Sequence, residues 1–204
     1  MSSDHRPDAE LLRIWAEGDK AAGGELLRRH FELLYRFFAT KIDDKVDDLV
    51  QRTLLAAVER RDHIQDPDKF RAYLLGIARY QLIGYIRSKS SGREDVLDAS
   101  VADAAASPPS LVLARQEQRL LMRALRSLPL RLQIAVGLYY FDGMKVADIA
   151  DITEAPVGTV KDRLARARTL LREAAETLAS SPQLAASTVG GVETWLRSIA
   201  LPQR

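Results

Sequence analysis

Apolar residues recur at steps of three and four along most of this 204-residue chain, a spacing that places them on one face of successive α-helices. The clearest such stripe lies in residues 44–61 and contains Val46, Leu49, Val50, Thr53, Leu54, Ala57 and Val58. No stretch shows the strict alternation of a half-buried strand. The sequence therefore predicts an all-α fold.

Turn residues and shifts in composition divide the predicted helices into two small domains joined by a flexible acidic linker. The first domain contains a short helix with Leu11, Leu12 and Trp15, followed by one stripe that runs from Leu27 through Phe31, Leu34 and Phe38 to Ile42. The linker combines small and polar residues, an excess of acids and Pro108-Pro109. The predicted boundaries are 1–89 for the first domain, 90–110 for the linker, 111–179 for the second domain and 180–204 for a C-terminal extension.

Residues 156–172 form a helix whose two sides differ sharply. Its expected core face consists of Val157, Val160, Leu164, Ala167 and Leu171, whereas the opposite side is small, polar and basic. A shorter helix at 146–152 precedes it across a tight turn, and Pro156 suits a first helical turn. This is the helix-turn-helix layout, in which the second helix enters the DNA major groove.

The polar side chains of this helix match the groups that a base-reading helix needs. Lys161 and Arg166 can donate to guanine acceptors, and Asp162 can accept from a cytosine amino group. Ala165 leaves room for a thymine methyl. The remaining candidates suit phosphate contacts, namely Thr159, Arg163 and Arg168. A solvated face of an ordinary bundle helix would carry similar charges, so the pattern alone leaves both interpretations open.

Two segments together resemble a known family. The second domain, through "LPLRLQIAVGLYYFDGMKVADIADITEAPVGTVKDRLARARTLLREA", is similar to the C-terminal promoter-reading domain of the extracytoplasmic-function (ECF) class of bacterial sigma factors. The first domain resembles their other domain through "DDLVQRTLLAAVERR" and "FRAYLLGIARYQLIGYIR". The resemblance implies an alternative sigma factor that binds core RNA polymerase, at its clamp coiled coil and flap, and directs initiation at specific promoters.

The resemblance also implies a polymerase-binding face on the helix at 46–60. The outward polar residues of that helix contact the clamp coiled coil in the family, and here they are Asp47, Asp48, Gln51 and Arg52. The helical pattern separately leaves these four outside the core. The family more often carries an acidic residue where Arg52 stands.

A third implied surface reads and opens the −10 element. The family uses the loop before the "FRAY" helix, here residues 61–69, and the outward face of that helix to capture unstacked bases. The candidates here are His63, Gln65, Tyr80, Gln81, Tyr85 and Arg87. Tyr73, Tyr80 and Gly84 replace the tryptophan, asparagine and aspartate that are usual in the family, and Tyr73 is expected in the core.

Other classes of function have little support in the sequence. The three histidines lie in unlike contexts, and there is no phosphate-cradling glycine loop or Glu-x-x-His pair, so neither catalysis, nor a metal, nor a cofactor is expected. The absence of cysteine and of any long apolar run fits a cytoplasmic protein. A plain helix-turn-helix regulator, or a sigma-like protein that binds polymerase without initiating, remains an alternative.

Two segments and one partner stay open at this point. The linker either mimics nucleic acid in the RNA exit path, as linkers of the resembling proteins do, or is a plain tether. The extension places Val192, Trp195, Leu196 and Ile199 at helical spacing, and this face either docks on the protein or a partner, or frays. An anti-sigma factor is a common partner in the family, although no residue here specifies one.

Overall fold

The computed structural model describes residues 6–61, 64, 66–89, 97–98, 116–178 and 196, and every regular element within these ranges is helical. The prediction of an all-α fold is confirmed. The first group of helices consists of α1 (Asp8–Ala16), α2 (Lys20–Arg29), α3 (Phe31–Ala39), α4 (Val46–Glu59), the 3₁₀ turn η2 (Pro67–Lys69) and α5 (Phe70–Lys89). The second group consists of α6 (Gln116–Ser127), α7 (Leu130–Val136), the π-helical turn η4 (Gly137–Phe141), α8 (Val146–Thr153) and α9 (Val157–Leu178).

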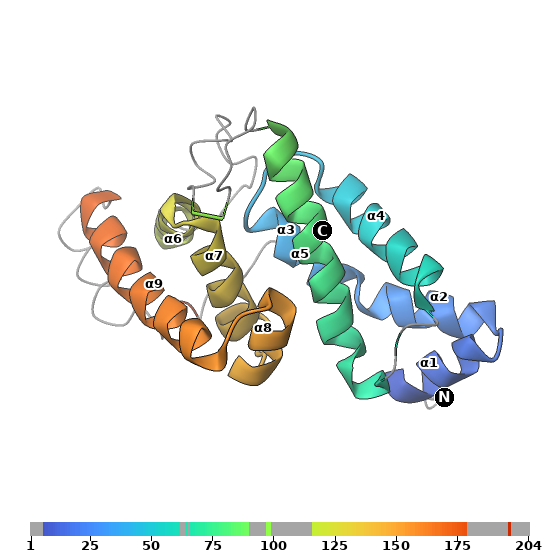
Figure 1. Ribbon diagram of the computed structural model, residues 1–204. Coiled ribbons are helices and arrows are strands. Elements are labelled where there is room, and N and C mark those ends of the chain that lie inside the picture. Colours follow the sequence, from blue (N-terminus) through green and yellow to red (C-terminus); the bar gives the residue numbers. More distant parts are fainter. Residues whose placement is uncertain are drawn as a thin grey trace.

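The two groups lie side by side, with the long helix α5 of the first group facing α8 of the second (Figure 1). Helix α4 packs on the other side of α5, away from α8 (Figure 1). Helix α9 packs on α6, α7 and α8 and closes the second group. One cluster of buried apolar side chains extends through both groups. The arrangement therefore leaves α4 and α9 on opposite sides of α5 (Figure 1).

Helices α1 and α2 form a tight antiparallel pair around a tryptophan. The carboxylate of Asp19 caps α2 by accepting hydrogen bonds from the amides of Ala21 and Ala22. Trp15 is buried against Gly23, where an added Cβ would lie 2.5 Å from the indole Nε1. Gly23 therefore lets the two helices approach closely.

The stripe expected from Leu27 to Ile42 is divided between α2 and α3, and its last residue, Ile42, lies beyond the end of α3. The chain turns at His30, which is buried. Its Nε2 lies 2.8 Å from Asp8 Oδ2 and its ring packs edge-on against Phe70, and these contacts stabilise the turn. Both contacts come from segments distant in the sequence. Burial lowers the pKa of His30, and the neighbouring Asp8 carboxylate opposes that shift.

Two residues predicted for the core are exposed instead. Val58 is 37 % and Val157 44 % exposed. Val58 follows the buried Ala57 and is rotated about 100° from it around α4. Val157 begins α9, one turn before the stripe first becomes buried at Val160. The other stripe residues of α9, from Val160 to Leu171, are buried as predicted.

Only short parts of the linker and the extension belong to the described residues. Leu97 accepts a hydrogen bond from the amide of Arg131 at 3.1 Å, and Asp98 forms an ion pair with the Arg131 guanidinium at 2.5 Å. Leu196 is buried in the common apolar cluster, whereas the other three residues of its predicted face lie outside the described residues. Among the described helices, none is long and apolar enough to cross a bilayer.

Candidate polymerase and nucleic-acid interfaces

Helices α8 and α9 are joined by a three-residue turn, an arrangement compatible with the predicted helix-turn-helix. Ile149 and Ile152 of α8 are buried, as are Val160 and Leu164 of α9, and the two helices pack on each other. Glu154 ends α8 in the left-handed backbone region, with φ +52°. The buried stripe fixes the rotation of α9, so its opposite side faces outward.

The structure brings together four of the seven residues predicted to contact the −35 element. Lys161, Asp162, Ala165 and Arg166 are all exposed on the outer side of α9. Thr159, Arg163 and Arg168 are half-buried beside them. This separates the candidates for base contact from those assigned to phosphates.

Arg163 and Arg168 are turned partly toward the protein. The Arg168 guanidinium donates to the Tyr140 hydroxyl at 3.4 Å. Burial, followed by the positive charges of Arg131 and Arg79, lowers the pKa of Arg163. These two arginines consequently lie closer to protein groups than the sequence predicts, although both remain at the edge of the exposed face.

The predicted polymerase-binding residues form one continuous face of α4. Asp47, Gln51 and Arg52 are exposed and Asp48 is half-buried. Arg52 Nη2 pairs with Asp48 Oδ2 at 2.9 Å. Leu55, which is 58 % exposed, extends this face by one turn. Leu55 was not predicted as part of this face, and its only signal in the sequence is an apolar residue outside the buried stripe.

The predicted −10 residues of α5 fall on two different sides of the helix. Tyr80 and Arg87 are both exposed and, seven residues apart, share one side. Gln81 and Tyr85 are half-buried and lie about 100–140° further around the helix. His63 and Gln65 lie outside the described residues.

Tyr85 belongs to a local cluster with the loop before α4. Its hydroxyl donates to Asp44, and Lys89 binds the same carboxylate at 2.6 Å. The hydrogen bond from Lys89, followed by that from Tyr85, lowers the pKa of Asp44, while burial and Asp44 raise the pKa of Tyr85. Tyr85 is thus held against the protein, whereas Tyr80 faces the second group of helices.

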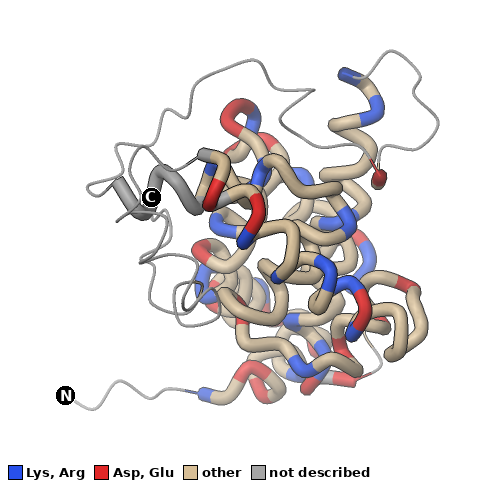
Figure 2. Tube along the Cα trace, turned by 90° about the vertical axis from the view of Figure 1, so that its left-hand side faces the viewer, with Lys and Arg blue, Asp and Glu red and all other residues tan. Residues whose placement is uncertain are grey.

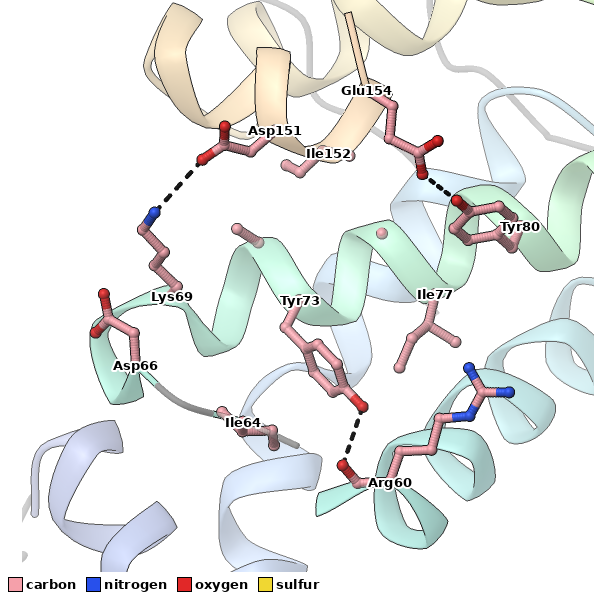
Figure 3. A pocket seen from close by; sticks show the side chains of 12 residues that line it. Arg60, Ile64, Asp66, Lys69, Tyr73, Ile77, Tyr80, Asp151, Ile152 and Glu154 are labelled. Carbon is pink, nitrogen blue, oxygen red and sulfur yellow. Dashed lines mark hydrogen bonds and ion pairs between the residues drawn. The ribbon is translucent and has the colours of Figure 1, made fainter. Parts of the chain in front are cut away.

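A cavity of about 510 Å³ opens between α5 and α8 (Figure 3). Tyr73, Ile77 and Tyr80 line it from α5, and Ile152 lines it from α8. Tyr73 is half-buried and its hydroxyl donates to the Arg60 carbonyl at 3.3 Å. Tyr73 therefore packs against the edge of the core and also forms a wall of the cavity, so it is less buried than the sequence predicts.

Polar side chains from the two groups of helices meet at both ends of this cavity (Figure 3). Lys69 Nζ lies 3.4 Å from Asp151 Oδ2 at one end. At the other end the Glu154 carboxylate accepts from the Tyr80 hydroxyl and lies 3.4 Å from Arg79 Nη1. The hydrogen bond to Glu154 is the main cause of the raised pKa of Tyr80. Neither Asp151 nor Glu154 was predicted to have a role from the sequence.

A second polar cluster between the groups is buried. Arg36 Nη2 donates to Asp142 Oδ1 at 3.2 Å, and Arg71 donates to the Asp142 carbonyl. Burial raises the pKa of Asp142, and the nearby Lys41 and Arg36 oppose that shift. Lys41 is 2 % exposed, and its ammonium donates to the Phe37 carbonyl at 2.7 Å.

The π-helical turn provides the space for this cluster. The Asp142 amide donates to the Gly137 carbonyl, five residues back, at 3.1 Å. An added Cβ at Gly137 would lie 3.3 Å from Lys41 Nζ, so glycine admits the ammonium at this point. Close by in sequence to Lys41, Asp43 forms a further ion pair with Arg126 of α6, at 2.6 Å.

Surface charge alone does not delineate a binding site. Viewed from the α9 side, basic and acidic residues are interspersed along the chain (Figure 2). In the part of the chain that the structure describes, no group of three His, Asp or Glu side chains could hold a metal ion. The candidate interfaces are consequently defined by helix faces, on α4, α5 and α9.

Comparisons with known proteins agree with this layout. Residues 25–92 match the family described as Sigma-70 region 2, and residues 118–171 match Sigma-70, region 4. The chain is 31 % identical over 177 residues to the RNA polymerase sigma factor NccH of Alcaligenes xylosoxydans xylosoxydans, covering 83 % of this chain and 95 % of that protein. It is 27 % identical over 177 residues to the ECF RNA polymerase sigma-E factor of Salmonella typhimurium, covering 81 % and 93 %.

Solved structures of two complexes are similar over most of the chain. CnrH in complex with the cytosolic domain of CnrY matches with a TM-score of 0.62 at 26 % identity, covering 84 % of this chain and 99 % of that one. The sigma factor RpoE bound to the anti-sigma factor NepR, from Bartonella quintana, matches with a TM-score of 0.59 at 25 % identity, covering 76 % and 98 %. The chain belongs to the extracytoplasmic-function class of sigma-70 family RNA polymerase sigma factors, and it acts as an alternative sigma factor in promoter-specific transcription initiation.

Proposed function

We propose that three helix faces divide the work of initiation in this chain. The domain at 1–89 binds core polymerase through α4 and the −10 element through α5 and the loop before it. The domain at 111–179 binds the −35 element through α9, and residues 90–110 connect the two. The observation that supports this division best is that the buried stripes of α4 and α9 leave their predicted contact residues on the outer surface.

Contacts of α9 with the −35 element are divided between bases and phosphates. The exposed side of α9 presents two donors, Lys161 and Arg166, and one acceptor, Asp162, which can reach base edges. Ala165 lies on the same side and leaves room for a thymine methyl. The half-buried Thr159, Arg163 and Arg168 flank that side, which suits them to the DNA backbone.

The −10 element is read on the Tyr80 side of α5. Tyr80 presents an aromatic face on which an unstacked base can stack, and Arg87 shares that side and carries a positive charge. A captured base is accommodated in the cavity beside Tyr73 and Ile77, and His63 and Gln65 remain candidates for binding it from the loop before α5. Gln81 and Tyr85 face another side of α5 and contribute less.

Partners and location follow from the same assignment. Sigma factors are specificity subunits, so the polymerase performs the chemistry and this chain needs no catalytic site of its own. One similar structure is that of a sigma factor with an anti-sigma factor, and we propose that an anti-sigma protein also regulates this chain. A bacterial protein that binds core polymerase and promoter DNA acts in the cytoplasm, and we propose that location for this chain.

Run-off transcription from a library of promoter fragments tests the proposal. Core polymerase is supplied with or without the chain, and transcripts that require the chain are expected to share two promoter elements. Stable binding to DNA without any transcript would instead favour a plain helix-turn-helix regulator. Co-elution with polymerase without a transcript would favour a protein that binds polymerase and does not initiate.

A charge reversal on α4 tests the polymerase-binding face separately. Asp48→Lys removes the pair with Arg52 and places two cations four residues apart, which costs the helix a few tenths of a kcal/mol. We expect core polymerase to bind this variant about tenfold more weakly with little change in helicity. Glu32→Lys, on the exposed side of α3, is the control. Equal polymerase affinity for both variants would remove α4 from the proposal.

A further inference from the structure

A second, small cavity of about 20 Å³ lies where the two groups of helices meet, and three arginines line it. Arg79 comes from α5, Arg131 from α7 and Arg163 from α9. The remaining lining residues are Leu97, Ile134 and Thr153. Three helices that are distant in the sequence therefore bring three guanidinium-bearing side chains to one place.

These arginines are partly withdrawn from solvent. The side chains of Arg79 and Arg131 are 11 % and 33 % exposed, and Arg163 is half-buried. Burial lowers the pKa of Arg163, and the positive charges of Arg131 and Arg79 lower it further. Because like charges repel more strongly where less water screens them, the three arginines together favour a negatively charged partner.

The carboxylates near the three arginines do not pair with all of them. Asp98 forms an ion pair with Arg131 at 2.5 Å, and Glu154 lies 3.4 Å from Arg79. The charge of Asp98 also acts on Arg163 and opposes the lowering of its pKa. However, no carboxylate within the described ranges forms an ion pair with Arg163. Three cations therefore meet two carboxylates at this place.

Asp98 indicates that this position can accept an oxyanion. It belongs to the predicted linker, and the carbonyl of its neighbour Leu97 accepts from the Arg131 amide at 3.1 Å, which keeps the carboxylate beside the cavity. The Asp98 side chain is 54 % exposed, so the carboxylate lies at the open edge of the cavity. Because an ion pair exposed to this degree contributes little stability, a soluble anion can take its place.

We propose that Arg79, Arg131 and Arg163 form a binding site for a phosphate group, and that the Asp98 carboxylate competes with phosphate for it. The group is either inorganic phosphate or the terminal phosphate of a small metabolite. A guanidinium donates to phosphate through two parallel N–H groups, and a tetrahedral phosphate has oxygens for all three arginines. The two oxygens of a single carboxylate satisfy fewer of these donors. Only Arg163 is also assigned to promoter DNA, so the site goes beyond the proposed function.

The size of the cavity explains why phosphate and Asp98 exclude each other. A volume of about 20 Å³ holds one group the size of a water molecule, which is less than a phosphate needs. When the Asp98 carboxylate leaves Arg131, it frees both the guanidinium and the space beside it. Phosphate can therefore bind only as Asp98 withdraws, and removal of the carboxylate should strengthen phosphate binding.

Equilibrium dialysis of the full chain with radiolabelled inorganic phosphate tests the proposal. The chloride concentration is held constant, and neither DNA nor polymerase is present, so the result does not depend on the proposed function. We expect the wild type to bind one phosphate per chain. Asp98→Asn should bind it about tenfold more tightly, because the tethered competing charge is gone while the size of the side chain is kept. Since Asp98 is largely exposed, this substitution leaves the core intact.

Arginine variants made in the Asp98→Asn chain identify the donors. Arg163→Gln has no ion pair with a described residue to lose, and Arg131→Gln no longer separates a pair with Asp98. Each is expected to weaken phosphate binding about tenfold. Arg79→Gln should weaken it as well, because the site joins the two groups of helices. Arg123→Gln, at an exposed arginine of α6 that does not line the cavity, removes the same charge and is the control.

Competition with glycerol 3-phosphate distinguishes the two sources of the phosphate group. Displacement of the labelled phosphate at similar concentrations would support the proposal with a phosphorylated metabolite as the ligand. Binding of inorganic phosphate that glycerol 3-phosphate does not displace would support it with the free ion as the ligand. Circular dichroism at 222 nm checks that every variant keeps its helices.

Three results would overturn the proposed phosphate site. Equal phosphate affinities of the wild type and Asp98→Asn would contradict competition by the carboxylate. A loss of affinity in Arg123→Gln as large as that in Arg163→Gln would mean that phosphate responds only to net charge. Binding to Asp98→Asn that does not saturate would show that the three arginines form no specific site.

Discussion

Among single residues, the buried Lys41 is expected to make the free energy of unfolding depend on pH. Its ammonium is fully enclosed, and burial lowers its pKa from 10.5 to about 8, with the charge of Asp142 opposing the shift. Below pH 8 the lysine is protonated in both the folded and unfolded chain, so folding bears the whole cost of burying the charge. Between pH 8 and 10.5 the folded chain releases the proton first, and the free energy of unfolding rises with pH.

We therefore expect the free energy of unfolding of the wild type to rise by about 2 kcal/mol between pH 7.5 and 9.5, relative to that of Lys41→Met. Methionine fills similar space and carries no charge that could titrate. Urea unfolding at several pH values measures the difference, and Lys20→Met, at an exposed lysine, should track the wild type. Parallel curves for wild type and Lys41→Met would contradict the assignment of a buried, titrating ammonium.

Two adjacent glycines in α2 give a matched test of packing at a single position. A Cβ at Gly23 would lie 2.5 Å from Trp15 Nε1, whereas a Cβ at Gly24 would meet nothing within 4 Å. Gly23→Ala is expected to lower the free energy of unfolding by about 1–3 kcal/mol because the indole ring must move. Gly24→Ala should raise it by about 0.5–1 kcal/mol through helix propensity alone. Thermal unfolding followed by circular dichroism compares the two, and equal effects would mean that Trp15 does not pack on Gly23.

At the scale of the element, α9 is the helix that we propose binds the −35 element. Arg166 lies on the exposed side with Lys161, and each can contribute a base contact. We expect Arg166→Ala to cost about 1–3 kcal/mol in binding to the preferred −35 sequence and to relax the preference at one base position. Arg172→Ala, two turns further along α9, should weaken binding of all sequences slightly and equally. Competition binding with −35 variants measures both, and an unchanged preference in Arg166→Ala would remove it from base recognition.

Features that depend only on residues close in the sequence could be predicted, above all which face of a helix is buried. The stripe of α9 from Val160 to Leu171 and the outward face of α4 follow from helical spacing, and both are found as predicted. The break at His30 could not be predicted, because it depends on contacts with Asp8 and Phe70. Val157 was misplaced because spacing identifies a face and does not show where along the helix its packing partner begins.

Contacts between the domains escaped prediction for a different reason. Arg36 and Asp142 lie 106 residues apart, and no local pattern pairs them. A tight turn between the helices predicted at 146–152 and from residue 156 on was expected, but the left-handed backbone of Glu154 and its contact with Tyr80 were not. The −10 candidates were treated as one set for the same reason, since the sequence does not show which neighbours each side of α5 contacts. In the structure Tyr80 and Tyr85 lie on different sides of that helix.

At the scale of the whole molecule, Asp142 couples the two domains. Its buried carboxylate accepts from Arg36 and is close to Lys41, and its carbonyl accepts from Arg71, so one residue of the second domain meets three cations of the first. Without the carboxylate those cations would be enclosed with less compensation. Because removal of one partner from a buried charged cluster typically costs about 3–5 kcal/mol, Asp142→Ala should separate the domains before either unfolds.

We expect the wild type to unfold in a single transition, since one apolar cluster extends through both domains, and Asp142→Ala to unfold in two. Trp15 reports on the first domain alone when Trp195→Phe removes the second tryptophan, whereas circular dichroism at 222 nm reports on all helices. The two signals should coincide in the wild type and diverge in the variant. Asp148→Ala, on α8 but outside the cluster, is the control. Coincident transitions in Asp142→Ala would mean that apolar packing alone couples the domains.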